Sequence, residues 1–256
     1  MMQNLFLLRE MVRRDFQGRY AGSLLGLVWS FVQPLALLAI YHFVFRTVLK
    51  VSLAFERTEH FAVFLFCGLL PWNAVHEGLL RSSTAITENA ALVKRLRFPS
   101  ELLVLSVVAT ALLHEAIAGA IFLAVLIALG ELGWAGLPVL LLALPLQAAL
   151  TLGLGLVLAG FQVFFRDVVQ FLGMAMTAWF FLTPIVYPVS QVPERLRPWI
   201  ELNPLTALVG LYRQAFVGGE AALVPGTWAL AVAAAVALAL GCWLFRRLKP
   251  AFADEI

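Results

Sequence analysis

Two adjacent histidine and glutamate pairs, His76-Glu77 and His114-Glu115, are the residues of this chain whose types could bind a metal or transfer protons. A hydrolytic zinc site of the form H-E-x-x-H needs a second histidine four residues after the first, on the same face of one helix. Neither pair has this second histidine, and adjacent residues of a helix point about 100° apart. We therefore expect no metal site and no catalytic centre at either pair.

The chain also lacks the loop that holds nucleotide phosphates. The pattern G-x-x-x-x-G-K-[ST] requires a glycine followed by lysine, and no glycine of the sequence is followed by one. The net charge of +3 is too small to indicate a nucleic-acid surface. The sequence therefore predicts a chain that carries no cofactor, does not hydrolyse ATP by itself and has no nucleic-acid partner.

The composition is that of a membrane protein. Of the 256 residues, 62% are hydrophobic and 13% charged, whereas about a quarter of an ordinary soluble domain is charged. A bilayer core about 30 Å thick needs roughly 20 apolar residues in a helix, and stretches of that length recur. We predict an all-α membrane protein with six transmembrane helices, at 24–48, 61–80, 102–129, 137–163, 168–187 and 227–246. Small residues such as Gly153 and Gly155 in the fourth span allow close helix contact.

Glu77 and Glu115 both fall within predicted spans, near the end of 61–80 and in the middle of 102–129. An ionisable group inside a bilayer is costly, and it faces a bundle interior or a wet path. Two interpretations stay open for each carboxyl group: a place on a transport path, or an interhelical hydrogen bond by a carboxyl that can be protonated.

Charge and periodicity predict how the chain is arranged about the membrane. In the N-terminal segment, apolar side chains recur every three or four residues opposite a polar face, which indicates an amphipathic helix in the interface. Cytoplasmic loops retain an excess of Lys and Arg. The N-terminal segment, the 81–100 loop, the turn at Arg166 and the C-terminal tail together carry twelve, whereas the alternate loops carry six. We predict that both termini are cytoplasmic.

The segment from Pro184 to Gly226 holds six of the twelve prolines, so it cannot form one regular helix. Within it, Leu205 to Val217 is mostly apolar, with Arg213 as its one charged residue, and a helix of that length, about 20 Å, is too short to cross a membrane. A re-entrant or interfacial helical segment before the last span fits this pattern, and an ordinary extracytoplasmic loop is the alternative.

Aromatic residues are dense in the first two predicted spans and again around the fourth and fifth. As lipid-facing or interfacial residues they would be ordinary, because Trp and Tyr favour the membrane interface. Facing inward, they would offer flat apolar platforms to sugar rings along a channel. The candidates for this second role are Trp29, Tyr41, Trp72, Phe161, Phe164, Trp179, Phe180 and Tyr187.

Four segments in order along the chain resemble the membrane subunit of type 2 ABC exporters, most closely the permeases for O-antigen, capsular and teichoic acid polysaccharides. They are "RRDFQGRYAGSLLGLVWSFVQPL" from Arg13, "LRFPSELL" from Leu96, "VFFRDVVQ" from Val163 and "LNPLTALVGLYRQAFVGG" from Leu202. The resemblance implies a homodimer of six-span subunits in the cytoplasmic (inner) membrane. It also implies two copies of a separate ABC ATPase that bind ATP and Mg, and export of a glycan carried on undecaprenyl diphosphate.

The resemblance further implies roles for particular residues. The family's coupling helix maps to the loop that contains "VKRLRFPSELL", at about Thr84 to Phe98. Its best candidates for contact with the ATPase are Asn89, Leu92, Val93, Lys94 and Arg95. The N-terminal helix would bring Arg13, Arg14 and Arg19 to the lipid diphosphate, since arginine makes forked phosphate contacts; topology and anionic lipid attraction are the alternative.

The whole chain is expected to form one transmembrane domain. Its parts are an interface helix at 1–23, spans at 24–80, a cytoplasmic coupling loop at 81–100, spans at 101–187, a re-entrant segment at 188–226, the last span at 227–246 and a tail at 247–256. Three other functions compete with polysaccharide export. The first is a type 2 exporter of drug or lipid, and the second is a membrane-embedded lipid-phosphate or glycosyl-transfer enzyme using Glu77, Glu115 and the cytoplasmic arginines. The third is a secondary transporter, which inverted repeats would favour.

Overall fold

The computed structural model describes residues 2–20, 28–48, 61–95, 98–218 and 220–256, and all regular structure in these ranges is helical. The predicted all-α class is therefore confirmed for them. The long helices are α1 (Met2–Tyr20), α2 (Trp29–His42), α3 (Phe61–Glu88), α5 (Glu101–Leu129), α6 (Leu140–Phe164), α7 (Val168–Leu182), α9 (Pro204–Val217) and α10 (Thr227–Leu248). The short elements are η2 (Phe43–Val48), α4 (Ala90–Arg95), η3 (Trp134–Val139), η4 (Val189–Gln191), α8 (Arg197–Leu202), η5 (Lys249–Ala251) and α11 (Phe252–Glu255).

Four helical segments of the described chain are long and apolar enough to cross a membrane. They are Phe61–Glu88, Glu101–Leu129, Trp134–Phe164 and Thr227–Ala251, and they correspond to the predicted spans 61–80, 102–129, 137–163 and 227–246. The first predicted span covers α2 and η2, but its residues 24–27 lie outside the described part.

Helix α7 is shorter than the predicted span 168–187. It ends at Leu182 after 15 residues, about 22 Å of helix. The next residue, Thr183, is extended (φ −102°, ψ 132°). Thr183 precedes Pro184, and a residue before proline is pushed out of the helical region by the proline ring. The proline-rich segment thus begins where the helix stops.

Helix α3 is longer than predicted and ends at Glu88 rather than near residue 80. Residues 81–88 contain no glycine or proline, and their hydroxyl groups bond to the helix itself, as Ser83 Oγ does to the Leu80 carbonyl (2.6 Å). Arg81, expected in a loop, therefore stands on the same helix as Glu77. Most residues of α3 are buried, since α5, α6, α7 and α9 pack around it.

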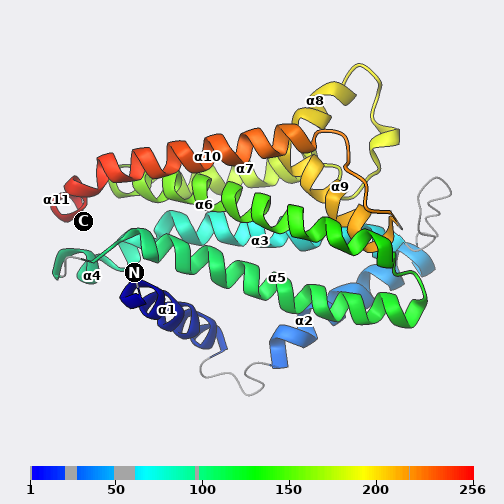
Figure 1. The fold of residues 1–256 in the computed structure, drawn as a ribbon, viewed down its shortest axis with the longest axis horizontal. Coiled ribbons are helices and arrows are strands. Elements are labelled where there is room, and N and C mark those ends of the chain that lie inside the picture. The colour runs from blue at the N-terminus through cyan, green and yellow to red at the C-terminus, as the bar shows by residue number, and fades with distance from the viewer. Residues whose placement is uncertain (1, 21–27, 49–60, 96–97, 219) are drawn as a thin grey trace.

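Figure 1 shows the long helices side by side, with both termini, α4 and α11 at one end of the bundle and α8 and α9 toward the other. Helices α6 and α10 cross closely at Gly153 and Gly241: a side chain at either glycine would overlap the backbone of the opposite helix. Both termini lie at the same end of the bundle, which agrees with the even number of spans that the sequence predicts.

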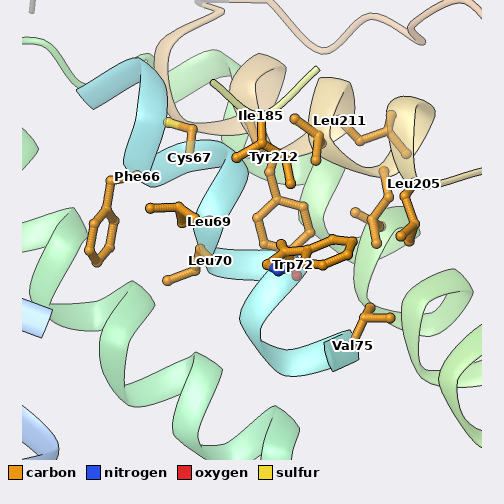
Figure 2. Close-up of a cluster of buried hydrophobic side chains, with 14 of the residues drawn as sticks. Phe66, Cys67, Leu69, Leu70, Trp72, Val75, Ile185, Leu205, Leu211 and Tyr212 are labelled. Atoms are coloured by element: carbon orange, nitrogen blue, oxygen red, sulfur yellow. The ribbon is translucent and has the colours of Figure 1, made fainter. Parts of the chain in front are cut away.

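Helix α9 is buried inside the bundle rather than lying over its surface. It packs against α3, α6, α10 and η3, and Figure 2 shows Leu205, Leu211 and Tyr212 of α9 directed at Trp72 and neighbouring residues of α3. Asn203 caps its first turn, accepting a hydrogen bond at Oδ1 from the Leu205 backbone N–H (3.1 Å).

Candidate functional site

A charged cluster joins α1, α3 and α5 at the α4 end of the bundle. The Arg81 guanidinium of α3 pairs with Asp15 of α1 through one nitrogen, and its other nitrogen lies 3.5 Å from Glu77 Oε1, one helical turn back. His114 of α5 places Nδ1 3.5 Å from the same Glu77 oxygen, and its ring stacks at a tilt on Phe16 (5.1 Å between centroids). These five residues are called the Arg81 cluster below.

The Arg81 cluster fastens the N-terminal helix to the bundle. Its charged side chains are only partly exposed, from 24% for Glu77 to 32% for Arg81, so their interactions are less screened than those of surface pairs. Because Arg81 bonds to carboxylates of both α1 and α3, a displacement of α1 would break an ion pair. The cluster therefore couples the position of α1 to that of α3.

Two of the three arginines predicted to meet a lipid diphosphate, Arg13 and Arg14, have side chains within the described structure. Arg14 lines a cavity of about 90 Å³ beside the Arg81 cluster, together with Glu88 and Asn89. Arg13 is exposed, and the side chain of Arg19 lies outside the described residues. The diphosphate role remains a prediction.

The predicted coupling residues fall on the turn before α4 and on α4 itself. Asn89 starts this helix: its carbonyl accepts from the Leu92 (2.9 Å) and Val93 (3.2 Å) backbone N–H groups, and its side chain donates to the Ala85 carbonyl (2.9 Å). Val93 packs on an apolar cluster of the bundle, whereas Lys94 is exposed. The Arg95 side chain lies outside the described residues.

Glu115 is held in a buried chain of hydrogen bonds that links three helices. Gln147 of α6 donates to Glu115 Oε2 of α5 (2.7 Å) and accepts from the Tyr212 hydroxyl of α9 (2.6 Å). Glu115 is 5% exposed, Gln147 0% and Tyr212 1%. This geometry is the interhelical hydrogen bond that the sequence left as one of two alternatives for Glu115.

Replacing Gln147 with leucine is expected to destabilise the protein, since the buried Tyr212 hydroxyl and Glu115 Oε2 both lose the partner that joins them. Each unsatisfied buried group costs about 1–3 kcal/mol. Glu115→Gln keeps an oxygen that can accept from Gln147 and serves as the matched control, with a smaller loss. Thermal unfolding in detergent measures both. Equal midpoints for Gln147→Leu and the unmodified chain would contradict the structural role.

Six of the eight aromatic candidates have described side chains, and these belong to different elements of the fold. Trp72 is buried and meets Phe180 edge-on (5.3 Å), while Trp179 Nε1 donates to Asn203 Oδ1 (2.9 Å). The Tyr187 hydroxyl bonds to the Phe181 carbonyl (2.9 Å).

Two other described candidates belong to α6. Phe161, which is exposed, and Phe164, which is half-buried, are in the last turn of this helix. The side chains of Trp29 and Tyr41 lie outside the described residues. A channel-lining role therefore stays a prediction for all eight aromatic residues.

Several residues of these networks were missed in the sequence. The spacing of Glu77 and Arg81, four residues apart, is a local signal for an ion pair once both are placed on one helix. Asp15, Gln147 and Tyr212 meet partners from distant parts of the chain, and no local pattern indicates such pairs.

Long apolar helices packed around a buried central helix, with a charged cluster and a short helix at one end, define an integral membrane protein of the helical class. Residues 7–217 match the family described as ABC-2 type transporter, and the chain belongs to this family. The resemblance drawn from the four sequence segments is thereby confirmed.

Individual relatives are permeases and transport proteins. The chain is 30% identical over 254 residues to the O-antigen export system permease protein RfbA of Myxococcus xanthus, covering 98% of this chain and 95% of the relative. It is 29% identical over 217 residues to a protein of the same description from Klebsiella pneumoniae, with 83% and 81% covered. It is 26% identical over 248 residues to the polysialic acid transport protein KpsM of Escherichia coli, with 93% and 92% covered.

Proposed function

We propose that this chain is the transmembrane subunit of an ATP-driven ABC transporter that exports a lipid-linked cell-surface polysaccharide across the cytoplasmic membrane. The observation that carries the proposal is similarity over almost the whole chain to an O-antigen export permease, within the ABC-2 type transporter family. The sequence has no nucleotide-binding loop. Hydrolysis of ATP with Mg therefore belongs to a separate ATPase subunit, in two copies beneath a homodimer of this chain.

The arrangement in the membrane is part of the same proposal. Six spans cross the bilayer, with α2 and η2 as the first and α7 as the fifth, and both termini lie in the cytoplasm. On this topology α4 is the cytoplasmic coupling helix, and α8 and α9 belong to the re-entrant segment. Burial of α9 among α3, α6 and α10 supports this assignment, since a loop on the outer surface would not be packed on several sides.

The ATPase contact is proposed at the exposed side of α4. Lys94 projects from the bundle, with Leu92 before it and Arg95 after it, and Val93 seats the helix on the apolar cluster. The positive charges of Lys94 and Arg95 would meet acidic groups of the ATPase, and such complementarity steers association and fixes register.

Reversing both charges, Lys94→Glu with Arg95→Glu, is expected to separate ATP hydrolysis from export. The substituted chain should insert into the membrane as before, because α4 is outside the spans, yet transported glycan per ATP hydrolysed should fall about tenfold, the effect of losing about 1.4 kcal/mol of interface free energy. Glycan export and ATPase activity are measured together in reconstituted vesicles. Arg246→Glu with Arg247→Glu, on exposed positions of α10, matches the charge change and is expected to couple normally.

Two results would contradict the proposal at different levels. Unchanged coupling in the Lys94 and Arg95 variant would remove the docking site from α4. A purified chain that runs as a monomer, associates with no ATPase and turns over a lipid phosphate or glycosyl donor alone would instead favour a membrane-embedded enzyme.

A further inference from the structure

The C-terminal end of the chain folds back onto the bundle beside α4. After α10, the short elements η5 and α11 turn the chain so that α11 contacts both α4 and α6. Figure 1 shows α11 at the same end of the bundle as α4. A helix of only four residues has almost no stability of its own, so contacts with the rest of the bundle must hold α11 in place.

Phe252 is the main anchor of this segment. Its side chain is 1% exposed, and its ring packs edge-on against Phe245 of α10 (5.2 Å between centroids) and at a tilt against Phe164 of α6 (6.3 Å). Burial of a phenylalanine side chain removes a large apolar surface from water and so stabilises the segment that carries it. This burial holds a four-residue helix that has almost no intrinsic stability.

The residues that surround Phe252 also support α4. Phe252 belongs to an apolar cluster, called the Phe252 cluster here, that includes Ala85 and Ile86 from the end of α3. Val93 of α4 and Phe98 of the following turn pack on this cluster. Helix α4 has only six residues, so its position depends on packing rather than on its own hydrogen bonds.

A second contact ties the C-terminal segment to the far end of the coupling region. Lys249 Nζ of η5 lies 2.7 Å from Glu101 Oε2, at the first residue of α5. Both side chains are more than one third exposed, so this pair contributes little to overall stability. Its geometry nevertheless connects η5 to the point where the chain leaves the turn after α4.

We propose that residues 249–256 form a brace that positions α4 for its contact with the ATPase, with Phe252 as the positioning residue. The inference rests on the proposed function, in which α4 receives the ATPase. The buried ring holds the surface on which Val93 sits, and the Lys249 to Glu101 pair holds the turn that follows. Without the brace, α4 would not hold one fixed position relative to α3 and α6.

The test uses the full chain in complex with its ATPase subunit and the substitution Phe252→Ala. Hydrogen exchange of the amides in residues 89–98 is expected to rise about tenfold, because local opening becomes easier where packing is lost. Exchange in the central part of α3 should stay unchanged, and transported glycan per ATP hydrolysed should fall severalfold. Phe252→Leu keeps an apolar side chain and should restore most of the protection, while Asp254→Ala, at an exposed position of α11, is the matched control.

The outcomes separate the brace from the proposed function. If the unmodified chain associates with no ATPase, the proposed function fails, and exchange at residues 89–98 still reports on the brace. If it does associate but Phe252→Ala leaves exchange and coupling unchanged, the brace is overturned. A uniform rise in exchange across all helices would also overturn it, because Phe252 would then serve general stability.

A second variant keeps the test decisive where Phe252→Ala fails to insert. Lys249→Glu places two carboxylates opposite each other and should loosen residues 89–98, whereas the exchange of charges Lys249→Glu with Glu101→Lys should restore their protection. Failure of the double variant to recover protection would contradict a role for this pair in the brace.

Discussion

Replacing Gly153 with leucine is expected to prevent α6 and α10 from packing, with the largest loss of stability of any substitution described here. A side chain at Gly153 would overlap the backbone of Ala237 and Leu238, and one at Gly241 would overlap the backbone of Gly153. Backbone cannot move aside as a flexible side chain can, so the two helices must separate along their most extensive contact. Overpacking costs about 1–3 kcal/mol where side chains can adjust, and more is expected against backbone.

The measurement is the thermal midpoint in detergent, together with the yield of folded protein on size-exclusion chromatography. Gly241→Leu should behave like Gly153→Leu, because a side chain at Gly241 would overlap the backbone of Gly153 on the opposite helix. Gly173→Ala in α7 is the matched control: an added methyl group there meets no atom within 4 Å, and removal of a helical glycine stabilises by about 1 kcal/mol. A midpoint for Gly153→Leu equal to that of the unmodified chain would show that α6 and α10 do not cross at this point.

Reversing the charge of Arg81 is expected to release α1 from the bundle and to abolish most export. Arg81→Glu brings a third carboxylate to Asp15 and Glu77, so two attractions become repulsions. Breaking a fully buried pair costs about 3–5 kcal/mol; we expect a smaller loss, since the paired side chains are 32% and 25% exposed. Export should fall at least about tenfold if α1 must hold its place during transport, because 1.4 kcal/mol corresponds to one factor of ten.

Exchange of the two charges is the decisive test of the Arg81 cluster. In Arg81→Glu with Asp15→Arg, the new arginine on α1 meets two carboxylates on α3, the same balance as in the unmodified chain, and both export and protection of α1 from hydrogen exchange should recover. Arg9 occupies an exposed position of α1. Arg9→Glu changes the net charge by the same amount as Arg81→Glu without altering a residue of the Arg81 cluster, and it should have little effect. Recovery in neither measurement would mean that Arg81 acts through something other than its bond to Asp15.

The sequence predicted the features that depend on hydropathy and on residues that end helices. Apolar length gave the helices that became α3, α5, α6 and α10, and the apolar run from Leu205 to Val217 gave the buried helix α9. The end of α7 before Pro184 follows from proline sterics, yet the predicted span passed over it. The prediction also ended α3 too early, because it treated Arg81 as a loop residue rather than as a helix residue paired with Asp15 and Glu77.

The candidate site was predictable only in its components. Glycine and alanine in the fourth span indicated close packing, but only the tertiary structure chose Gly241 as the partner of Gly153. Glu115 was marked by the cost of a carboxyl group in a bilayer, and its partner Gln147 became known only when α5 and α6 were placed side by side.

The order of residues along the chain thus determined the class of protein, the places of its long helices and the family it belongs to. Helix periodicity, apolar length and sequence motifs are all properties of residues that are near one another in the sequence. The tertiary structure alone decided that Asp15 meets Arg81 and that Phe252 and Val93 belong to one apolar cluster. Such contacts depend on how helices pack across distances that no local pattern records, since the free energy that selects them is gained only when the separate faces come together.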